Sequence, residues 1–140
     1  MAIPAQYSAV IMENDPVQRD LMALVLQNLD CEVLTTCKAA EARRWLKERQ
    51  PDLLVMDTFL PQISGLDLLR SLRSAHLLEK TRVMVVSAFG FEEIIRQVAQ
   101  LGAQACLIKP LDLKVFTARA RVLLAMKPEK FGELAGTELI

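Results

Sequence analysis

The chain has 140 residues, enough for one domain with a sizeable core, and 52% of them are hydrophobic. Its 17 basic and 17 acidic residues cancel, so bulk charge gives no reason to expect direct binding to nucleic acid or to a membrane surface. Three widely spaced cysteines, no Cys-x-x-Cys pair and a single histidine argue against a zinc site. Because there is no signal-peptide pattern and no apolar run of membrane-spanning length, we expect a cytoplasmic protein with reduced thiols.

Five short apolar segments predict the strands of a parallel β-sheet. Two of them, at residues 53–56 and 83–86, are apolar without interruption, as expected of strands that are buried on both faces. The predicted strands span residues 8–12, 31–35, 53–56, 82–86 and 105–108.

Amphipathic segments that follow the strands predict five helices. Asp15 and Pro16 suit the N-cap and first position of the first helix, which runs to about residue 28. The others are predicted at about residues 39–49, 66–72, 92–101 and 112–126. On the first helix we expect an apolar stripe to face the sheet, formed by Val17, Leu21, Leu24, Val25 and Leu29. On the last helix the expected inward residues are Val115, Phe116, Ala120, Val122 and Leu123.

The alternation of strand and helix predicts an α/β fold built from right-handed βαβ units. We expect a doubly wound, five-stranded parallel sheet of flavodoxin-like order 2-1-3-4-5, with helices on both faces. Residues 1–127 are predicted to form this domain, and residues 128–140 a C-terminal tail or linker.

Polar side chains follow four of the predicted strands, at the point where each strand ends. Glu13, Asn14 and Asp15 follow the first, Asp57 the third, Ser87 the fourth and Lys109 the fifth. Alone, Asp57 fits an ordinary turn or cap, but in the predicted order these residues share the sheet edge where ligands bind. Crowded carboxylates favour a hard cation such as Mg²⁺. Beside it, Asp57 can attack phosphorus and Lys109 can bind phosphoryl oxygens.

The order of these motifs resembles that of response-regulator receiver domains of two-component signalling, which have the CheY-like fold. The motifs, within about residues 7–126, are Glu13-Asn14-Asp15-Pro16, Asp57-x-x-Leu60-Pro61-x-x-x-Gly65, Ser87-Ala88 and Lys109-Pro110. The resemblance implies that Asp57 accepts a phosphoryl group from a histidine kinase or phosphotransfer protein. It also implies Mg²⁺ bound by Glu13, Asp57 and the backbone carbonyl of Phe59, with Asn14 at the position of a further ligand.

Two positions depart from the family pattern. Asn14 stands where a second acid is usual, so we expect weaker Mg²⁺ binding and slower phosphorylation. Cys106 stands where an aromatic ring usually rotates after phosphorylation, and we interpret it as a small buried hydrophobic residue. Both departures support an alternative, in which the chain is a pseudo-receiver that binds partners without being phosphorylated.

The resemblance implies a signalling switch rather than an enzyme. The expected partners are a kinase or phosphotransfer protein, and either a downstream protein target or a fused output domain absent from this chain. Receiver domains commonly pair through the face that here spans residues 92–126, so a homodimer through it is an expectation. Phe89 and Phe91, in a loop expected near Asp57, are a hypothesis for a partner surface.

Overall fold

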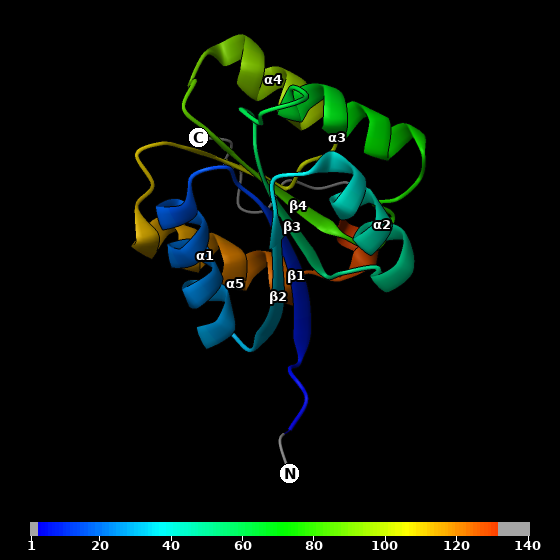
Figure 1. The fold of residues 1–140 in the computed structure, drawn as a ribbon, viewed down its shortest axis with the longest axis vertical. Helices are drawn as coiled ribbons and strands as arrows, with labels where there is room; N and C mark the ends of the chain where they lie inside the picture. Colours follow the sequence, from blue (N-terminus) through cyan, green and yellow to red (C-terminus); the bar gives the residue numbers. More distant parts are fainter. Residues whose placement is uncertain (1–2, 132–140) are drawn as a thin grey trace.

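Every strand of the sheet pairs in parallel with its neighbours, and the strand order is β2-β1-β3-β4-β5 (Figure 1). The computed structural model describes residues 3–131. The strands are β1 (Tyr7–Met12), β2 (Cys31–Thr36), β3 (Leu53–Asp57), β4 (Arg82–Ser87) and β5 (Ala105–Ile108). This order confirms the predicted doubly wound, flavodoxin-like sheet.

Helices cover both faces of the sheet, as predicted (Figure 1). On one face lie α1 (Pro16–Asn28) and α5 (Leu113–Ala125). The other face carries α2 (Ala39–Arg49), α3 (Gly65–Ser74) and α4 (Glu92–Gln100). A single 3-10 turn, η1 (Pro128–Lys130), follows α5 in the segment predicted to be tail or linker.

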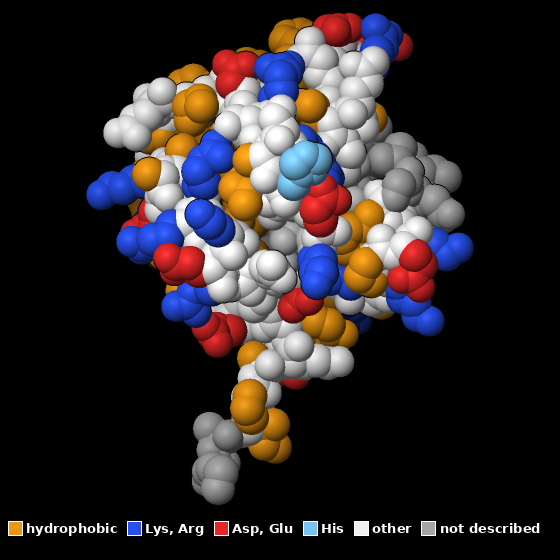
Figure 2. Space-filling model, turned by 90° about the vertical axis from the view of Figure 1, so that its right-hand side faces the viewer, with side chains coloured by type: hydrophobic (Ala, Val, Ile, Leu, Met, Phe, Trp, Pro, Cys, Tyr) orange, Lys and Arg blue, Asp and Glu red, His pale blue; other side chains and the backbone are white. Residues whose placement is uncertain are grey.

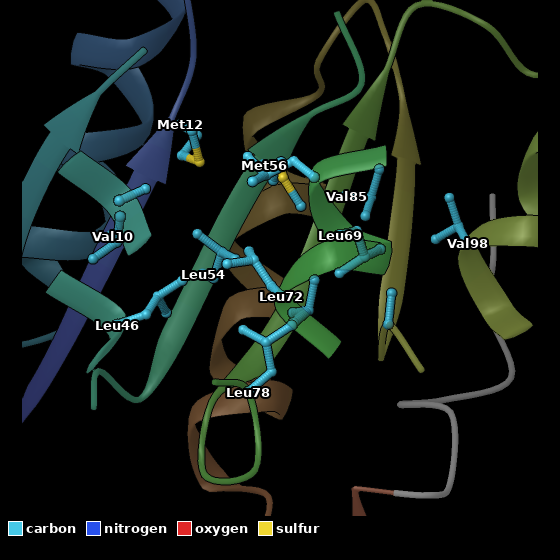
Figure 3. Packing of buried hydrophobic residues seen from close by; sticks show 14 of the residues in the cluster. Val10, Met12, Leu46, Leu54, Met56, Leu69, Leu72, Leu78, Val85 and Val98 are labelled. Atoms are coloured by element: carbon cyan, nitrogen blue, oxygen red, sulfur yellow. The ribbon is translucent and has the colours of Figure 1, made fainter. Parts of the chain in front are cut away.

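The sheet separates two hydrophobic cores, and alternate residues of each central strand point into one or the other. In β3, Leu53 and Val55 belong to the core under α1 and α5, whereas Leu54 and Met56 belong to the core under the other three helices. Figure 3 shows this second core, where side chains from three helices meet those of the strands. The central strands are therefore apolar on both faces, and this explains their uninterrupted apolar runs.

The predicted inward stripe of α1 was wrong in part. Val17, Leu21 and Leu24 are exposed, and the residues that α1 buries fully are Met22 and Leu26. Since α1 is apolar around most of its circumference, helical spacing fits more than one face and cannot select the buried one.

The predicted face of α5 was partly right. Phe116, Ala120 and Leu123 are buried, but Val115 and Val122 are 43% and 45% exposed. These two valines lie outside the strip of α5 that contacts the sheet. This strip is narrower than the spacing of apolar residues in the helix sequence suggests.

The surface mixes charges of both signs. On the face shown in Figure 2, Lys and Arg side chains are interspersed with Asp and Glu. Within residues 3–131, we find no helix with the length and hydropathy that a membrane crossing requires.

Two buried polar side chains tie the residues after α5 to the strands. Gln104 is fully buried, its Oε1 accepts from the Val83 N–H at 2.6 Å, and its Nε2 donates to the Phe131 carbonyl at 3.1 Å. The Arg82 guanidinium lies 5.0 Å from the centre of the Phe131 ring and also donates to the Met126 carbonyl. These contacts anchor the end of α5, and the turn after it, opposite the edge that carries Asp57.

We predict that Gln104→Leu lowers the free energy of unfolding by about 1–3 kcal/mol, because it leaves the Val83 N–H and Phe131 carbonyl without their partner. Urea unfolding measures the change. The matched control is Gln100→Leu, an exposed position at the end of α4, where we expect a change within about 0.5 kcal/mol. Equal stability of the two variants would contradict the prediction.

Candidate functional site

Glu13, Asp57 and Lys109 meet at the carboxyl edge of the sheet. The Lys109 Nζ donates to Glu13 Oε1 at 2.8 Å and to Asp57 Oδ2 at 2.5 Å. Both carboxylates are buried, with only 1% of Glu13 and 4% of Asp57 exposed. Because Glu13 follows β1, Asp57 ends β3 and Lys109 follows β5, the parallel topology brings together residues from three strands.

The backbone around Asp57 depends on a glycine. The Asp57 Oδ1 accepts from the Phe59 N–H at 2.9 Å, and the Gly65 N–H donates to the Thr58 carbonyl at 2.9 Å. A Cβ atom at Gly65 would lie 2.3 Å from the Asp57 carbonyl oxygen and 2.7 Å from the Thr58 Cα. Only glycine lets α3 begin this close to the Asp57 backbone, which explains the Gly65 of the sequence motif.

The Ser87 hydroxyl lies at the same edge but is bonded to the neighbouring loops rather than to Asp57. Ser87 is fully buried, and its Oγ donates to the Phe89 carbonyl at 3.1 Å. The same oxygen accepts from the Phe89 N–H at 3.0 Å and from Thr58 Oγ1 at 2.9 Å. The contact of Thr58 with Ser87 was not predicted from the sequence. The only sequence feature that could have indicated it is a hydroxyl residue directly after Asp57.

A cavity of about 370 Å³ opens beside the carboxylates. It is lined by Glu13, Asn14, Asp15, Asp57, Phe59, Ala88, Phe89 and Lys109. The Asp15 Oδ1 accepts from the Val17 N–H at 2.9 Å, so this carboxylate caps α1 as predicted.

The atoms around this cavity that can coordinate a metal ion are all oxygens. Among residues 3–131, no three acidic, histidine or cysteine side chains cluster in a way that could hold a metal ion. A cation here would therefore rely on the carboxylates of Glu13 and Asp57, the amide oxygen of Asn14 and backbone carbonyls. Such a hard, all-oxygen set suits Mg²⁺.

Burial and charge repulsion shape the titration of this cluster. Burial, followed by the neighbouring Asp57 carboxyl group, raises the pKa of Glu13 above its ordinary value of 4.5, and Lys109 only partly offsets this. Burial alone would lower the pKa of Lys109, but its bonds to Asp57 and Glu13 outweigh burial and raise it. The ammonium thus stays charged, while the negative charge of the site is only partly compensated.

Cys106 is a core residue, as interpreted from the sequence. It lies on β5, fully buried in the core under α2, α3 and α4. Burial raises the pKa of its thiol to about 11. The thiol therefore stays protonated near neutral pH, and a protonated thiol is a poor nucleophile.

The raised pKa of Glu13 predicts a pH-dependent stability. As pH rises above 4.5, the unfolded chain releases the Glu13 proton before the folded protein does. The contribution of Glu13 to the free energy of unfolding is therefore lost as pH rises through the pKa of the folded state. Glu13→Gln removes this dependence. We expect the free energy of unfolding of wild type minus that of the variant to fall with rising pH, in urea unfolding with EDTA. A difference that stays constant or rises with pH would contradict the pKa direction.

A doubly wound sheet with buried carboxylates and a lysine at its carboxyl edge defines the receiver class of α/β proteins. The family model for the response regulator receiver domain matches residues 9–121. The chain belongs to this family, which confirms the resemblance seen in the motifs.

One curated relative is the "Phosphate regulon transcriptional regulatory protein PhoB" of Rhizobium meliloti (strain 1021), which is 33% identical over 126 residues. The match covers 89% of this chain and 55% of the relative. The chain therefore spans about half the length of the curated relative that it matches.

Solved structures show the same fold. The chemotaxis response regulator CheY4 of Vibrio cholerae superposes with a TM-score of 0.75 at 17% identity, over 84% of this chain and 98% of that one. The BeF3-activated N-terminal receiver domain of Klebsiella pneumoniae RstA gives a TM-score of 0.75 at 24% identity, over 85% and 99%. At these identities the similarity supports the fold alone.

Proposed function

We propose that this receiver domain is a phosphorylatable switch whose Asp57 accepts a phosphoryl group from a histidine kinase or phosphotransfer protein. The observation that carries the proposal is the buried Asp57 carboxylate at the carboxyl edge, bonded to Lys109 and facing a cavity of about 370 Å³. Membership of the receiver family supports the same reaction.

The proposed reaction is an attack of an Asp57 carboxylate oxygen on the phosphorus of a phosphohistidine. The bond from phosphorus to the histidine nitrogen breaks, and an acyl phosphate forms on Asp57. Bound Mg²⁺ would neutralise charge on the carboxylates and phosphoryl oxygens. The residues proposed to hold it are Glu13, Asn14, Asp57 and Phe59, the last through its backbone carbonyl.

Lys109 and Ser87 are proposed to bind the phosphoryl group once it is attached. Lys109 supplies a fixed positive charge, since its pKa is raised and its Nζ already contacts Asp57. Ser87 would exchange its bonds to Thr58 and Phe89 for a bond to the phosphoryl group. Because Cys106 has no ring to rotate, we expect this exchange to pass the signal to the loop of residues 88–91.

The proposed partners follow from the family. A kinase or phosphotransfer protein would supply the phosphoryl group, and a downstream protein or a fused output domain would receive the signal. A homodimer through residues 92–126 gains support from the exposed Val115 and Val122 of α5. A cytoplasmic location is proposed from the sequence, whose three cysteines are odd in number and widely spaced.

The alternative, an interaction module that works without phosphorylation, rests on Asn14 and Cys106. The structure offers it little further support, because Asp57, Ser87 and Lys109 all lie at one edge and the cavity beside them is open. A module without phosphoryl transfer has no need to keep two carboxylates buried together, which is unfavourable for folding.

We predict that wild type, incubated with acetyl phosphate and Mg²⁺, gains the mass of a single phosphoryl group, and that Asp57→Asn gains none because the acceptor oxygen is lost. Mass spectrometry of the intact protein measures both. The matched control is Asp67→Asn, an exposed position on α3 that should be labelled like wild type. An unlabelled wild type would refute the proposed function, and a labelled Asp57→Asn would refute the acceptor.

Asn14→Asp should tighten Mg²⁺ binding about tenfold, because one added negative charge near a divalent ion is worth roughly 1–2 kcal/mol at a solvated site. Isothermal titration calorimetry measures the affinity. Asn28→Asp makes the same change at the far end of α1 and should leave the affinity unaltered. If the two variants behave alike, position 14 does not face the cation.

A further inference from the structure

Three exposed phenylalanines lie beside the carboxyl edge of the sheet, near Asp57. Phe59 is 69% exposed, Phe89 47% and Phe91 67%. The rings of Phe89 and Phe91 stack with their centres 6.1 Å apart and their planes within 10°. Large apolar side chains gathered on a surface mark interaction sites more often than chance, and aromatic residues contribute strongly to binding energy.

An uncharged groove of about 480 Å³ opens between the loop after β3 and the start of α4. Its apolar lining consists of Phe59, Leu60, Ile63, Leu66, Phe89 and Ile94. The remaining lining residues, Thr58, Gln62 and Ser64, are polar but uncharged. A groove of this size and character accommodates a bulky apolar side chain and offers nothing to pair with a charge inside it.

The surroundings of the groove are acidic. Phe59 and Phe89 also line the neighbouring cavity of about 370 Å³, so these two residues are shared between the groove and the acidic site. That cavity contains three carboxylates, and its one lining cation, Lys109, is already bonded to two of them.

The start of α4, whose Ile94 lines the groove, adds two more acids. The side chains of Glu92 and Glu93 are 91% and 61% exposed, and both pair with Arg96 at 3.7 Å and 2.9 Å. The acidic cavity and the first turn of α4 together present five carboxylates and two cations, Lys109 and Arg96. The groove is thus an apolar slot in a region of excess negative charge.

We propose that this groove binds a peptide segment of a partner protein that carries a bulky aliphatic or aromatic side chain next to Lys or Arg. The apolar side chain would fill the groove, and the basic residue would lie toward the acidic cavity, beyond Phe59 and Phe89. Charge complementarity selects this chemistry, since an acidic segment would meet like charge in the neighbouring cavity and at the start of α4. The binding does not require phosphorylation, so it can be measured on the unphosphorylated protein, independently of the proposed function.

A library of random displayed peptides, selected on the full unphosphorylated chain without Mg²⁺, tests the proposal. We expect enriched sequences to share a bulky apolar residue next to Lys or Arg. In fluorescence anisotropy, a selected peptide should bind Phe59→Ala and Phe89→Ala about tenfold more weakly than wild type. Leu24→Ala, at an exposed apolar position on α1, should bind like wild type.

A charge variant tests the negative charge around the groove separately. The double variant Glu92→Gln with Glu93→Gln lowers that charge and should weaken binding of a basic peptide about twofold, an effect that added salt removes. Enrichment of acidic peptides, absence of any enriched peptide, or equal binding to wild type and Phe59→Ala would overturn the proposal. Since no phosphoryl donor is present, none of these outcomes bears on the phosphorylation of Asp57.

Discussion

The carboxyl edge of the sheet depends on one ammonium group that lies between two buried carboxylates. Lys109 reaches from the end of β5 to Glu13 at the end of β1 and to Asp57 on β3. Two buried carboxylates without a cation would repel one another at a cost of several kcal/mol, so the lysine makes their burial tolerable. The compensation is incomplete, because two carboxylates face a single ammonium group. The edge therefore retains negative charge that a hard cation, a phosphoryl donor with its metal, or a basic partner residue can neutralise.

The rest of the fold serves to hold these three residues in place. Central strands that are apolar on both faces are fixed between two layers of helices, and their parallel register aligns the carboxyl ends. Gly65 then allows α3 to start against the backbone of Asp57, where any side chain would collide with a carbonyl oxygen. The Phe59 N–H, in the loop that the bond from Gly65 to Thr58 closes, then donates to the Asp57 carboxylate and orients it.

The sheet, its strand order and the residues at its carboxyl edge could all be predicted from apolar runs, caps and breaks in the sequence. The buried face of α1 could not, because its apolar residues surround most of the helix and only packing against the sheet selects Met22 and Leu26. The hydrogen bond from Thr58 to Ser87 could not be predicted from the sequence either. It joins the ends of two strands, and it depends on the rotamers of both side chains. The sequence suggested Phe89 as part of a partner surface but not the apolar groove itself, which forms only where two loops meet α3 and α4 in space.

Phe59 and Phe89 connect the chemistry of the edge to its surface. Both line the acidic cavity and the apolar groove, and the backbone of each is bonded to a site residue, Phe59 to Asp57 and Phe89 to Ser87. If Ser87 exchanges its bonds on phosphorylation as proposed, Phe89 loses the hydroxyl that fixes its backbone, and the wall of the groove changes with it. Phosphorylation would also place more negative charge beside the groove. A basic, apolar partner segment would then sense both changes at once, without the rotating ring that Cys106 cannot provide.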